Sequence, residues 1–286
     1  MHLKYNCLAC LYNQAFRAVK VNGFDDEVAT KALKESAKII SKLDMNQTPP
    51  EAAAIIYPKI SKIAKKEDLY REKKIESTKK AKKLIKKVLP KLKKVDIVDE
   101  ALRLGVAGNV IDFATEYSFD LEKELESVFE AKFAIDDKKL FKDRLKSAKS
   151  LMVIGDNVGE HLFDKEMIKI FLDFNPNLKV YYVTRGKPII NDVTKKDALN
   201  IGLDKIARVV DSGVDTPGFL LNRENQKTKE LFEKVDLVLA KGMGNFECME
   251  SIKDDRIFLL FKVKCDVVAS KIGKNIGDLI CLQGHL

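Results

Sequence analysis

The stretch Leu151-Met152-Val153-Ile154-Gly155-Asp156-Asn157-Val158-Gly159-Glu160 decides how this chain folds. An apolar run of strand type ends in a glycine, two oxygen-bearing side chains follow, and a helical pattern then begins. A strand-to-helix turn of this kind lies at the carboxyl edge of an open parallel sheet, where α/β proteins bind ligands. Asp156 and Asn157 offer the oxygen ligands that Mg²⁺ and Mn²⁺ prefer. The stretch therefore predicts a metal site, with a helix cap as the plainer alternative.

Alternating strand and helix patterns continue from about residue 148 to the end of the sequence. Such alternation requires right-handed crossovers and gives a mostly parallel sheet with helices on both faces. We therefore predict an α/β fold with a Rossmann-like, mostly parallel sheet in a three-layer sandwich. The predicted strands are residues 151–155, 179–184, 207–210, 237–240, 257–261 and 278–282.

The N-terminal half has a different pattern, in which apolar residues recur at helical spacing. Helices are predicted over residues 7–21 and 25–43. A third begins at Thr48-Pro49-Pro50-Glu51, because threonine can cap a helix and proline is tolerated in its first turn. We predict a helical domain over residues 1–147, in one or two small bundles, and a Rossmann-like α/β domain over residues 148–286 that carries the metal site.

The composition is that of an ordinary soluble protein. Of 286 residues, 45% are hydrophobic and 33% charged, and no apolar run approaches the length of a membrane span. The N-terminus lacks the apolar core of a signal peptide. Five cysteines in a chain of this length do not suggest a secreted disulfide scaffold. We expect a cytoplasmic protein with no membrane partner, and the sequence leaves its oligomeric state open.

The formal charge of +9 is concentrated in one segment. Residues 59–94 contain 16 lysines and arginines against 4 acidic residues, so the rest of the chain is slightly acidic. The lysines surround an apolar stripe, which favours a solvated helix face. A nucleic-acid-binding module that uses this helix is the alternative, but no aromatic residues are interleaved for base stacking. A third interpretation is that the positive field attracts anionic substrates.

Polar residues also follow the other predicted strands. Because the carboxyl ends of parallel strands share an edge, we expect these residues near Asp156 and Asn157. Asp192 would complete an oxygen set for a divalent ion, which polarises a phosphoryl oxygen and orients an attacking water. Lys241 and Arg185 would neutralise the other phosphate oxygens. The combination predicts phosphoryl chemistry, although each signal alone is weak.

Glycine-rich turns and a helical pair extend the candidate site. The turns Ser212-Gly213 and Gly242-Met243-Gly244 would donate backbone N–H groups to an anion. Asn109 and Asp112 are three residues apart and would share a helix face, which suits a functional pair and a structural cap equally well. Small residues around Gly105 and Gly108 would allow another backbone or a ligand to approach closely.

Several familiar motifs are absent from the sequence. There is no Walker loop, and Gly242-Met243-Gly244 is no dinucleotide fingerprint, because Glu247 stands at the third glycine position. Cys7-x-x-Cys10 lacks the second pair of ligands that a zinc site needs, and the three histidines are scattered. The Asp-x-Asp of haloacid-dehalogenase phosphatases is also missing, since the sequence reads Asp156-Asn157-Val158.

In their order along the chain, the motifs resemble the metal-dependent damage-control phosphatases, long catalogued as a domain of unknown function, number eighty-nine. The resemblance spans essentially the whole chain and is greatest to the compact archaeal and bacterial branch with an N-terminal CxxC. The motifs that carry it are Cys7-x-x-Cys10, Gly108-Asn109-x-x-Asp112, Gly155-Asp156-Asn157-x-Gly159-Glu160, Pro188-Ile189-Ile190-Asn191-Asp192, Ser212-Gly213 and Lys241-Gly242-x-Gly244-Asn245-Phe246-Glu247.

The resemblance implies a helical N-terminal part on a Rossmann-like domain, and a divalent ion (Mn²⁺, Co²⁺, Ni²⁺ or Mg²⁺) bound by Asp156, Asn157 and Asp192. It implies hydrolysis of phosphate monoesters of small metabolites, among them sugar phosphates and damaged phosphometabolites. Lys241 would contact phosphate, and Asp192 would serve as a ligand alone or also as a nucleophile. The residues expected to bind substrate are Asn109, Asp112, Glu160, Arg185, Ser212, Gly213 and Asn245.

A second activity has been proposed within the wider family and stays open for this chain. It is an S-adenosylmethionine-dependent protein carboxyl methyltransferase. The sequence has no glycine-rich nucleoside-binding loop, so this activity is the alternative to a phosphatase and not the first expectation.

Overall fold

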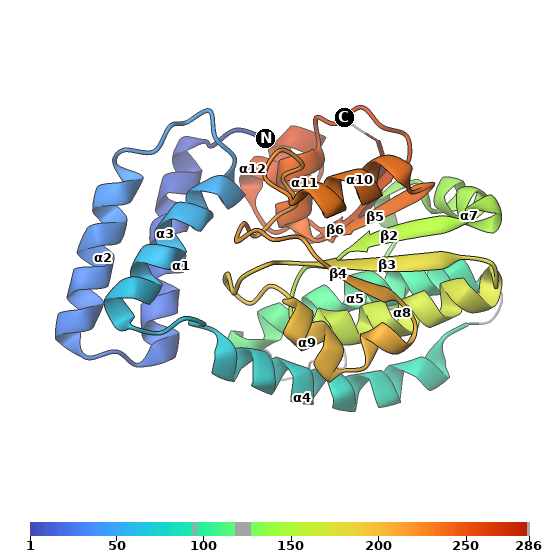
Figure 1. Ribbon diagram of the computed structural model, residues 1–286, viewed down its shortest axis with the longest axis horizontal. Coiled ribbons are helices and arrows are strands. Elements are labelled where there is room, and N and C mark those ends of the chain that lie inside the picture. The colour runs from blue at the N-terminus through green and yellow to red at the C-terminus, as the bar shows by residue number, and fades with distance from the viewer. Residues whose placement is uncertain (94–95, 118–126, 285–286) are drawn as a thin grey trace.

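A seven-stranded sheet forms the centre of the molecule, with helices on both of its sides (Figure 1). The computed structural model describes residues 1–93, 96–117 and 127–284, and the side chains of residues 109–117 lie outside the described part. The strand order is β1-β7-β6-β5-β2-β3-β4. The strands are β1 (Phe133–Asp136), β2 (Ser150–Ile154), β3 (Lys179–Thr184), β4 (Arg208–Asp211), β5 (Leu237–Lys241), β6 (Ile257–Lys262) and β7 (Leu279–Gln283).

Strand β2 occupies the interior of the sheet, between β5 and β3, and runs parallel to both. Residues 151–154 of this strand are all buried, as expected for a strand covered on both faces. Parallel pairing also joins β3 to β4, β5 to β6 and β1 to β7, whereas β7 is antiparallel to β6. The carboxyl ends of five neighbouring strands, β2 to β6, therefore share one edge.

Helices cover the two faces of the sheet and complete the predicted α/β sandwich. On one face α5 packs against α8, with α4 beyond them, and the buried side chains of α8 include Phe163, Met167, Ile168 and Phe171 at helical spacing. The opposite face is covered by α10, α11 and α12 (Figure 1). The bounds are α4 (Arg71–Val88), α5 (Ile97–Tyr117), α7 (Lys138–Ser147), α8 (Glu160–Phe174), α9 (Lys195–Asn200), α10 (Gln226–Lys234), α11 (Met243–Met249) and α12 (Asp266–Ile272), with short 3₁₀ turns η1 (Leu89–Lys91) and η2 (Leu203–Lys205).

Three N-terminal helices, α1 (Tyr5–Asn22), α2 (Asp26–Ile40) and α3 (Pro49–Ala64), form a bundle beside the sheet with a core of its own (Figure 1). The predicted start of α3 is confirmed. Thr48 Oγ1 accepts from Glu51 N at 3.3 Å, and Glu51 Oε2 accepts from Thr48 N at 2.8 Å. Within the described residues, none of the helices combines the length and the apolarity needed to cross a membrane.

Two features differ from the division expected at residue 148. Strand β1 precedes that point and pairs with β7 at the edge of the sheet. Helices α4 and α5 share a hydrophobic core with the sheet and not with the bundle of α1 to α3. Both features were missed because the four residues of β1 are too few for a period to show, and because a helical period does not say which surface a helix covers.

Candidate active site

The turns that follow β2 and β3 are joined to each other at the sheet edge. Asn157 and Asp192 pair in an isolated antiparallel bridge. On either side of it, Val193 N donates to Asp156 O and Val158 N donates to Asn191 O, both at 2.8 Å. Residues from two separate predicted motifs are thus held next to each other by backbone hydrogen bonds.

The side chains of Asp156 and Asn157 face one another in a nearly closed site. Asn157 Nδ2 donates to Asp156 Oδ2 at 2.9 Å, and the two residues are only 7% and 8% exposed. The backbone of Gly242 lies directly against the Asp156 carboxylate, so a Cβ at this position would collide with it. Gly242 also has a φ of 82°, which favours glycine. This glycine therefore makes room for the carboxylate.

Arg185 and Asn245 support the turn after β3 through hydrogen bonds. Arg185 is 1% exposed, and its Nε donates to Asp192 Oδ2 at 2.7 Å. Its Nη2 donates to Asn245 Oδ1 at 3.1 Å, and the same oxygen accepts from Phe219 N at 2.8 Å. Asn245 Nδ2 in turn donates to the carbonyl oxygens of Gly155 and Lys241. Both side chains were predicted to bind substrate, and here their hydrogen bonds hold the site together.

Lys241 is fully buried beneath the turn after β2, and three oxygen atoms accept hydrogen bonds from its Nζ. Its Nζ donates to Gly105 O at 2.8 Å, to Glu160 Oε1 at 2.8 Å and to Asp164 Oδ1 at 2.7 Å. Tyr182 adds a hydrogen bond to Asp164 at 2.8 Å. Because a lysine has three N–H donors, all of them are used by the protein in this arrangement. The predicted contact between Lys241 and phosphate stays a prediction.

The charges of the site are unbalanced near Asp156. Burial, followed by the negative charges of Glu160 and Asp192, raises the pKa of Asp156 well above its usual value. Burial raises the pKa of Glu160 to about 7, even though Lys241 opposes that shift. Lys264, in the loop after β6, lies close enough for its positive charge to lower the pKa of both carboxyl groups. A further cation would relieve this excess of negative charge.

Helix α5 approaches the site through its small residues, as their size predicted. A Cβ added to Gly108 would lie 2.7 Å from Glu160 Cγ, and one added to Gly105 would lie 3.4 Å from Lys241 Cε. Asn109 and Asp112 belong to this helix, but their side chains fall outside the described residues. Their predicted role as substrate ligands therefore stays a prediction.

Ser212 and Gly213 lie at the end of β4, next to the β3 turn. The two glycines Gly186 and Gly213 stand so close that a Cβ on Gly186 would collide with the Gly213 backbone. Ser212 is fully buried beside Glu224, and the positive charge of Arg185 reaches the same carboxyl. Burial nevertheless raises the pKa of Glu224 to about 7. The buried residue of this turn, Ser212, therefore lies beside the charged groups of the site, whereas Gly213 is exposed.

Several residues of the site were not predicted. Asp164 could have been found, because it stands four residues after Glu160 on one helix face and therefore beside it. Glu224 and Tyr182 gave no such signal, since each comes from a different element and meets the site only through the fold. Tyr57 of α3 is also close, because the charge of Asp192 contributes to raising its pKa. Lys264 follows a predicted strand but was not assigned a role.

The donor set suits a hard divalent cation. Asp156, Asn157 and Asp192 bring two carboxylates and one amide together, and such oxygen donors are preferred by Mg²⁺ and Mn²⁺. Among the described residues no three histidine, cysteine, aspartate or glutamate side chains form a ready metal cluster. The amide of Asn157 would therefore have to act as the third ligand. The burial of three carboxyl groups, those of Asp156, Glu160 and Asp192, is the observation that favours a cation there.

The cysteines do not form a second site in the described part of the chain. All five are free; Cys7 is buried in the core of α1 to α3, and Cys10 is exposed. Burial is the main cause that raises the pKa of the Cys7 thiol, which disfavours a reactive thiolate.

Comparisons with known proteins place this geometry among related chains. A family model described as a damage-control phosphatase ARMT1-like domain matches residues 3–280. A damage-control phosphatase of Pyrococcus horikoshii is 36% identical over 99% of this chain and 98% of its own length. A damage-control phosphatase of Archaeoglobus fulgidus is 29% identical over 96% of both chains. The crystal structure of a DUF89 family protein from Pyrococcus horikoshii matches 99% of both chains at 35% identity, with a TM-score of 0.91.

Proposed function

This chain belongs to the damage-control phosphatase ARMT1-like family, as its motifs led us to expect, and we propose that it is a metal-dependent phosphatase of small phosphorylated metabolites. The names of its relatives support the phosphatase role. The observation that carries the proposal is the bridge between Asn157 and Asp192, because it brings Asp156, Asn157 and Asp192 to one point of the sheet edge.

In this proposal, Asp156, Asn157 and Asp192 hold a divalent ion such as Mn²⁺, Co²⁺, Ni²⁺ or Mg²⁺. When bound, the ion supplies Lewis-acid polarisation of a phosphoryl oxygen and a lowered pKa for a bound water. Arg185 fixes the orientation of Asp192 through the Nε hydrogen bond, and Asn245 fixes Arg185 in turn. Whether Asp192 is a ligand alone or also a nucleophile is a separate question, which trapping of a phosphorylated enzyme by rapid acid quench, in the wild type and in Asp192→Asn, would decide.

Two lysines would neutralise the phosphate in different ways. Lys241 contributes its charge from beneath the site, where its three hydrogen bonds keep Glu160 and Asp164 in place. Lys264 is half-buried, and from the loop after β6 its positive charge acts on the carboxyl groups of Asp156 and Glu160. Because it approaches Asp156 from outside the network around Lys241, we expect Lys264 to contact phosphate oxygens. The turn at Gly213 is not expected to add backbone donors, because Ser212 N already donates to Thr184 O at 3.0 Å and Gly213 N to Asp211 Oδ1 at 2.8 Å.

The test is release of phosphate from p-nitrophenyl phosphate and from a panel of sugar phosphates. We expect release to require added Mn²⁺, Co²⁺, Ni²⁺ or Mg²⁺, to stop in EDTA, and to be lost in Asp156→Ala and Asp192→Ala. Metal binding has its own readout, since 100 times the Kd of the ion should stabilise the wild type by about 2.7 kcal/mol and these variants far less. Full activity in EDTA would refute the metal dependence.

The alternative functions stay predictions with their own tests. S-adenosylmethionine binding, measured by calorimetry, would support a methyltransferase, and no heat at high ligand concentration would count against it. Binding to nucleic acid should weaken steeply with salt if the lysines of α4 are used. If neutralising Lys79, Lys80, Lys82 and Lys83 left such binding unchanged, the helix would not be responsible for it.

A further inference from the structure

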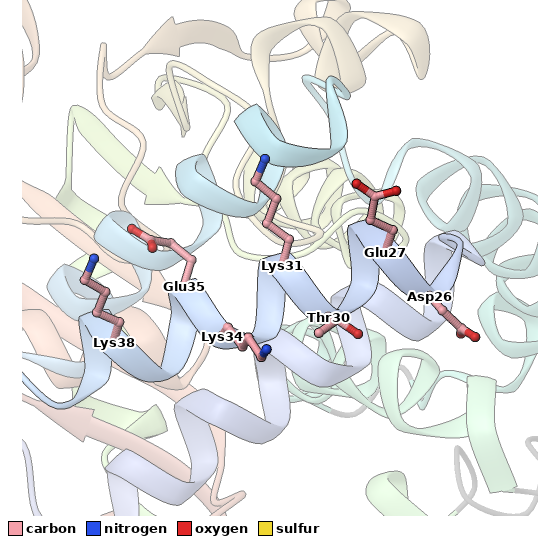
Figure 2. Close-up of a pocket in the computed structure, with 7 residues that line it drawn as sticks. All are labelled: Asp26, Glu27, Thr30, Lys31, Lys34, Glu35 and Lys38. Atoms are coloured by element: carbon pink, nitrogen blue, oxygen red, sulfur yellow. The ribbon is translucent and has the colours of Figure 1, made fainter.

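Two hollows at the surface differ in the chemistry of their lining residues and in the elements that supply them. One of about 620 Å³ runs along α2 and is lined by the charged side chains of that single helix (Figure 2). Its walls come from one element only, and none of its residues comes from the carboxyl edge of the sheet. A second cavity of about 210 Å³ has walls from both parts of the molecule, and we call it the α3 cavity. Its lining residues are Tyr57, Pro58, Ser61, Glu67, Asp68, Leu69, Lys187, Pro188, Ile189, Ile190 and Asp215.

The α3 cavity adjoins the candidate metal site through the turn after β3. Ile189 and Ile190 line the cavity, and Asp192 is two residues further on. Asp192 N donates to Ile189 O at 3.1 Å, so wall and candidate ligand belong to one compact turn. Tyr57 lines the cavity, and the charge of Asp192 adds to the burial that raises the pKa of this tyrosine. A molecule whose phosphoryl group sits at Asp192 would therefore extend towards this cavity.

The conformation of this turn is imposed from outside. Ile189 is 2% exposed and belongs to the core of α1 to α3, although the chain places it in the sheet domain. Ile190 has a φ of 45°, which is rare for a β-branched residue and persists only where surrounding packing enforces it. The bundle thus holds the turn in a strained form that shapes one wall of the cavity.

The walls combine an apolar floor with a polar rim. Tyr57, Leu69 and Pro188 are apolar surfaces, whereas Lys187, Glu67 and Asp215 bring charges. Asp68 is already paired with Lys74 at 3.3 Å. At about 210 Å³ the cavity is smaller than the roughly 300–1,000 Å³ of pockets that enclose drug-sized ligands, which suits one small ring or a short polyol.

We propose that the α3 cavity is the leaving-group subsite of the enzyme and that it selects a compact, hydroxyl-bearing organic group. Hydroxyl groups would donate to Asp215 and accept from Lys187, while the carbon skeleton lies on Tyr57 and Pro188. This inference rests on the proposed phosphatase function and adds the residues that decide which phosphate ester is used. It assigns the helical bundle a part in specificity, since α3 supplies Tyr57.

The charges of the rim add a second selection. With Asp68 paired to Lys74, the remaining acids Glu67 and Asp215 outnumber Lys187. A second phosphate on the leaving group would meet this negative charge. The subsite therefore favours monophosphates of neutral polyols over bisphosphates.

The experiment compares kcat/KM for a hexose 6-phosphate, a hexose bisphosphate and p-nitrophenyl phosphate, whose leaving group has no hydroxyl to bind in the rim. In Lys187→Met and Asp215→Asn we expect kcat/KM for the hexose 6-phosphate to fall about tenfold, chiefly through KM, as for a lost charged hydrogen bond. Release from p-nitrophenyl phosphate should change less than about twofold. Asp215→Asn should also narrow the gap between monophosphate and bisphosphate. Matched controls are Lys196→Met and Asp204→Asn, both exposed and outside the cavity.

The results distinguish failure of the proposed subsite from failure of the proposed phosphatase function. If Lys187→Met and Asp215→Asn change all three substrates equally, or change none, the subsite is refuted while the phosphatase stands. The same holds if the wild type cleaves only p-nitrophenyl phosphate. If the wild type releases phosphate from no ester with any of the four metals, the proposed function itself fails and the subsite with it.

Discussion

The two turns that carry the candidate metal ligands are held in different ways. The turn after β2 is enclosed by the α/β domain alone, with Gly242 against Asp156 and Gly108 against Glu160. The turn after β3 leaves the sheet and inserts Ile189 into the core of the N-terminal bundle. One turn therefore depends on local close packing, and the other depends on contact between two parts of the molecule. The candidate metal site forms only when both turns adopt these conformations.

This difference separates two kinds of sensitivity. A substitution beneath the turn after β2 should destabilise the sheet domain, because the side chains there carry buried charges that stabilise one another. Damage to the anchor of the second turn should loosen the bundle and the Asp192 side of the site, while the centre of the sheet keeps its structure. Substitutions on either side test whether the two turns, although joined by the bridge between Asn157 and Asp192, respond separately.

The largest effect is expected from Lys241→Met, which removes the cation beneath the first turn. Glu160 and Asp164 would be left as buried carboxyl groups without their partner, at a cost of about 3–5 kcal/mol in the free energy of unfolding. Urea denaturation would measure it. Adding Glu160→Gln and Asp164→Asn to Lys241→Met should recover part of the loss. A loss below about 1 kcal/mol would show that the network contributes little to stability.

The second turn should respond to Ile189→Ala, which leaves a cavity in the core of α1 to α3. Removing a buried isoleucine side chain costs about 2–5 kcal/mol. Hydrogen exchange should show lost protection in α1, α3 and the turn before Asp192, with β2 and β5 little changed. Ile276→Ala is the control, because Ile276 is 55% exposed. Equal loss of protection in β2 would contradict the independence of the two turns.

A smaller, local effect is expected from Gly242→Ala in the first turn. The new Cβ would displace the Asp156 carboxylate, and a shift of this kind costs about a hundredfold in kcat. Gly277→Ala is the matched control, since Gly277 also has a positive φ, 96°, but nothing lies within 4 Å of its Cβ position. Both variants carry the backbone strain, so only Gly242→Ala should lose activity. Equal activity in the two would mean that the carboxylate can move at no cost.

Much of the sheet edge was predictable because its signals are local. Apolar runs that end in polar residues placed Asp156, Asn157 and Asp192 at strand ends, and the parallel order of the strands brought them together. The short strand β1 and the packing of α4 and α5 against the sheet were missed, because both depend on long-range contacts. A helical pattern gives the period of a helix and not its neighbour.

The polar network was predictable only in part. Lys241 and Arg185 were expected to meet phosphate, since a lysine or arginine at a strand end usually faces a ligand. In the fold, Lys241 uses all three donors on Gly105, Glu160 and Asp164. Arg185 uses its Nε on Asp192 and its Nη2 on Asn245, while its Nη1 has no hydrogen-bond partner within the described residues. A sequence shows which charged residues are near an edge, but not which of them turn inward. Their hydrogen bonds within the protein are visible only in the fold.

A pH-dependent effect on stability is expected at Glu224, which lies behind the turn after β3 beside Arg185 and Ser212. Its pKa of about 7 in the folded protein exceeds the unfolded value, so between roughly pH 4.5 and 7 the native state binds more protons. Stability from this group is therefore present at low pH and is lost as the pH rises through that window, by up to about 1.4 kcal/mol per pH unit. Glu224→Gln lacks the titration, so the unfolding free energy of the wild type minus that of this variant should fall from pH 5 to pH 7. The exposed Glu233→Gln should give a flat difference, and a flat difference for Glu224→Gln as well would show that Glu224 is ionised in the native state throughout.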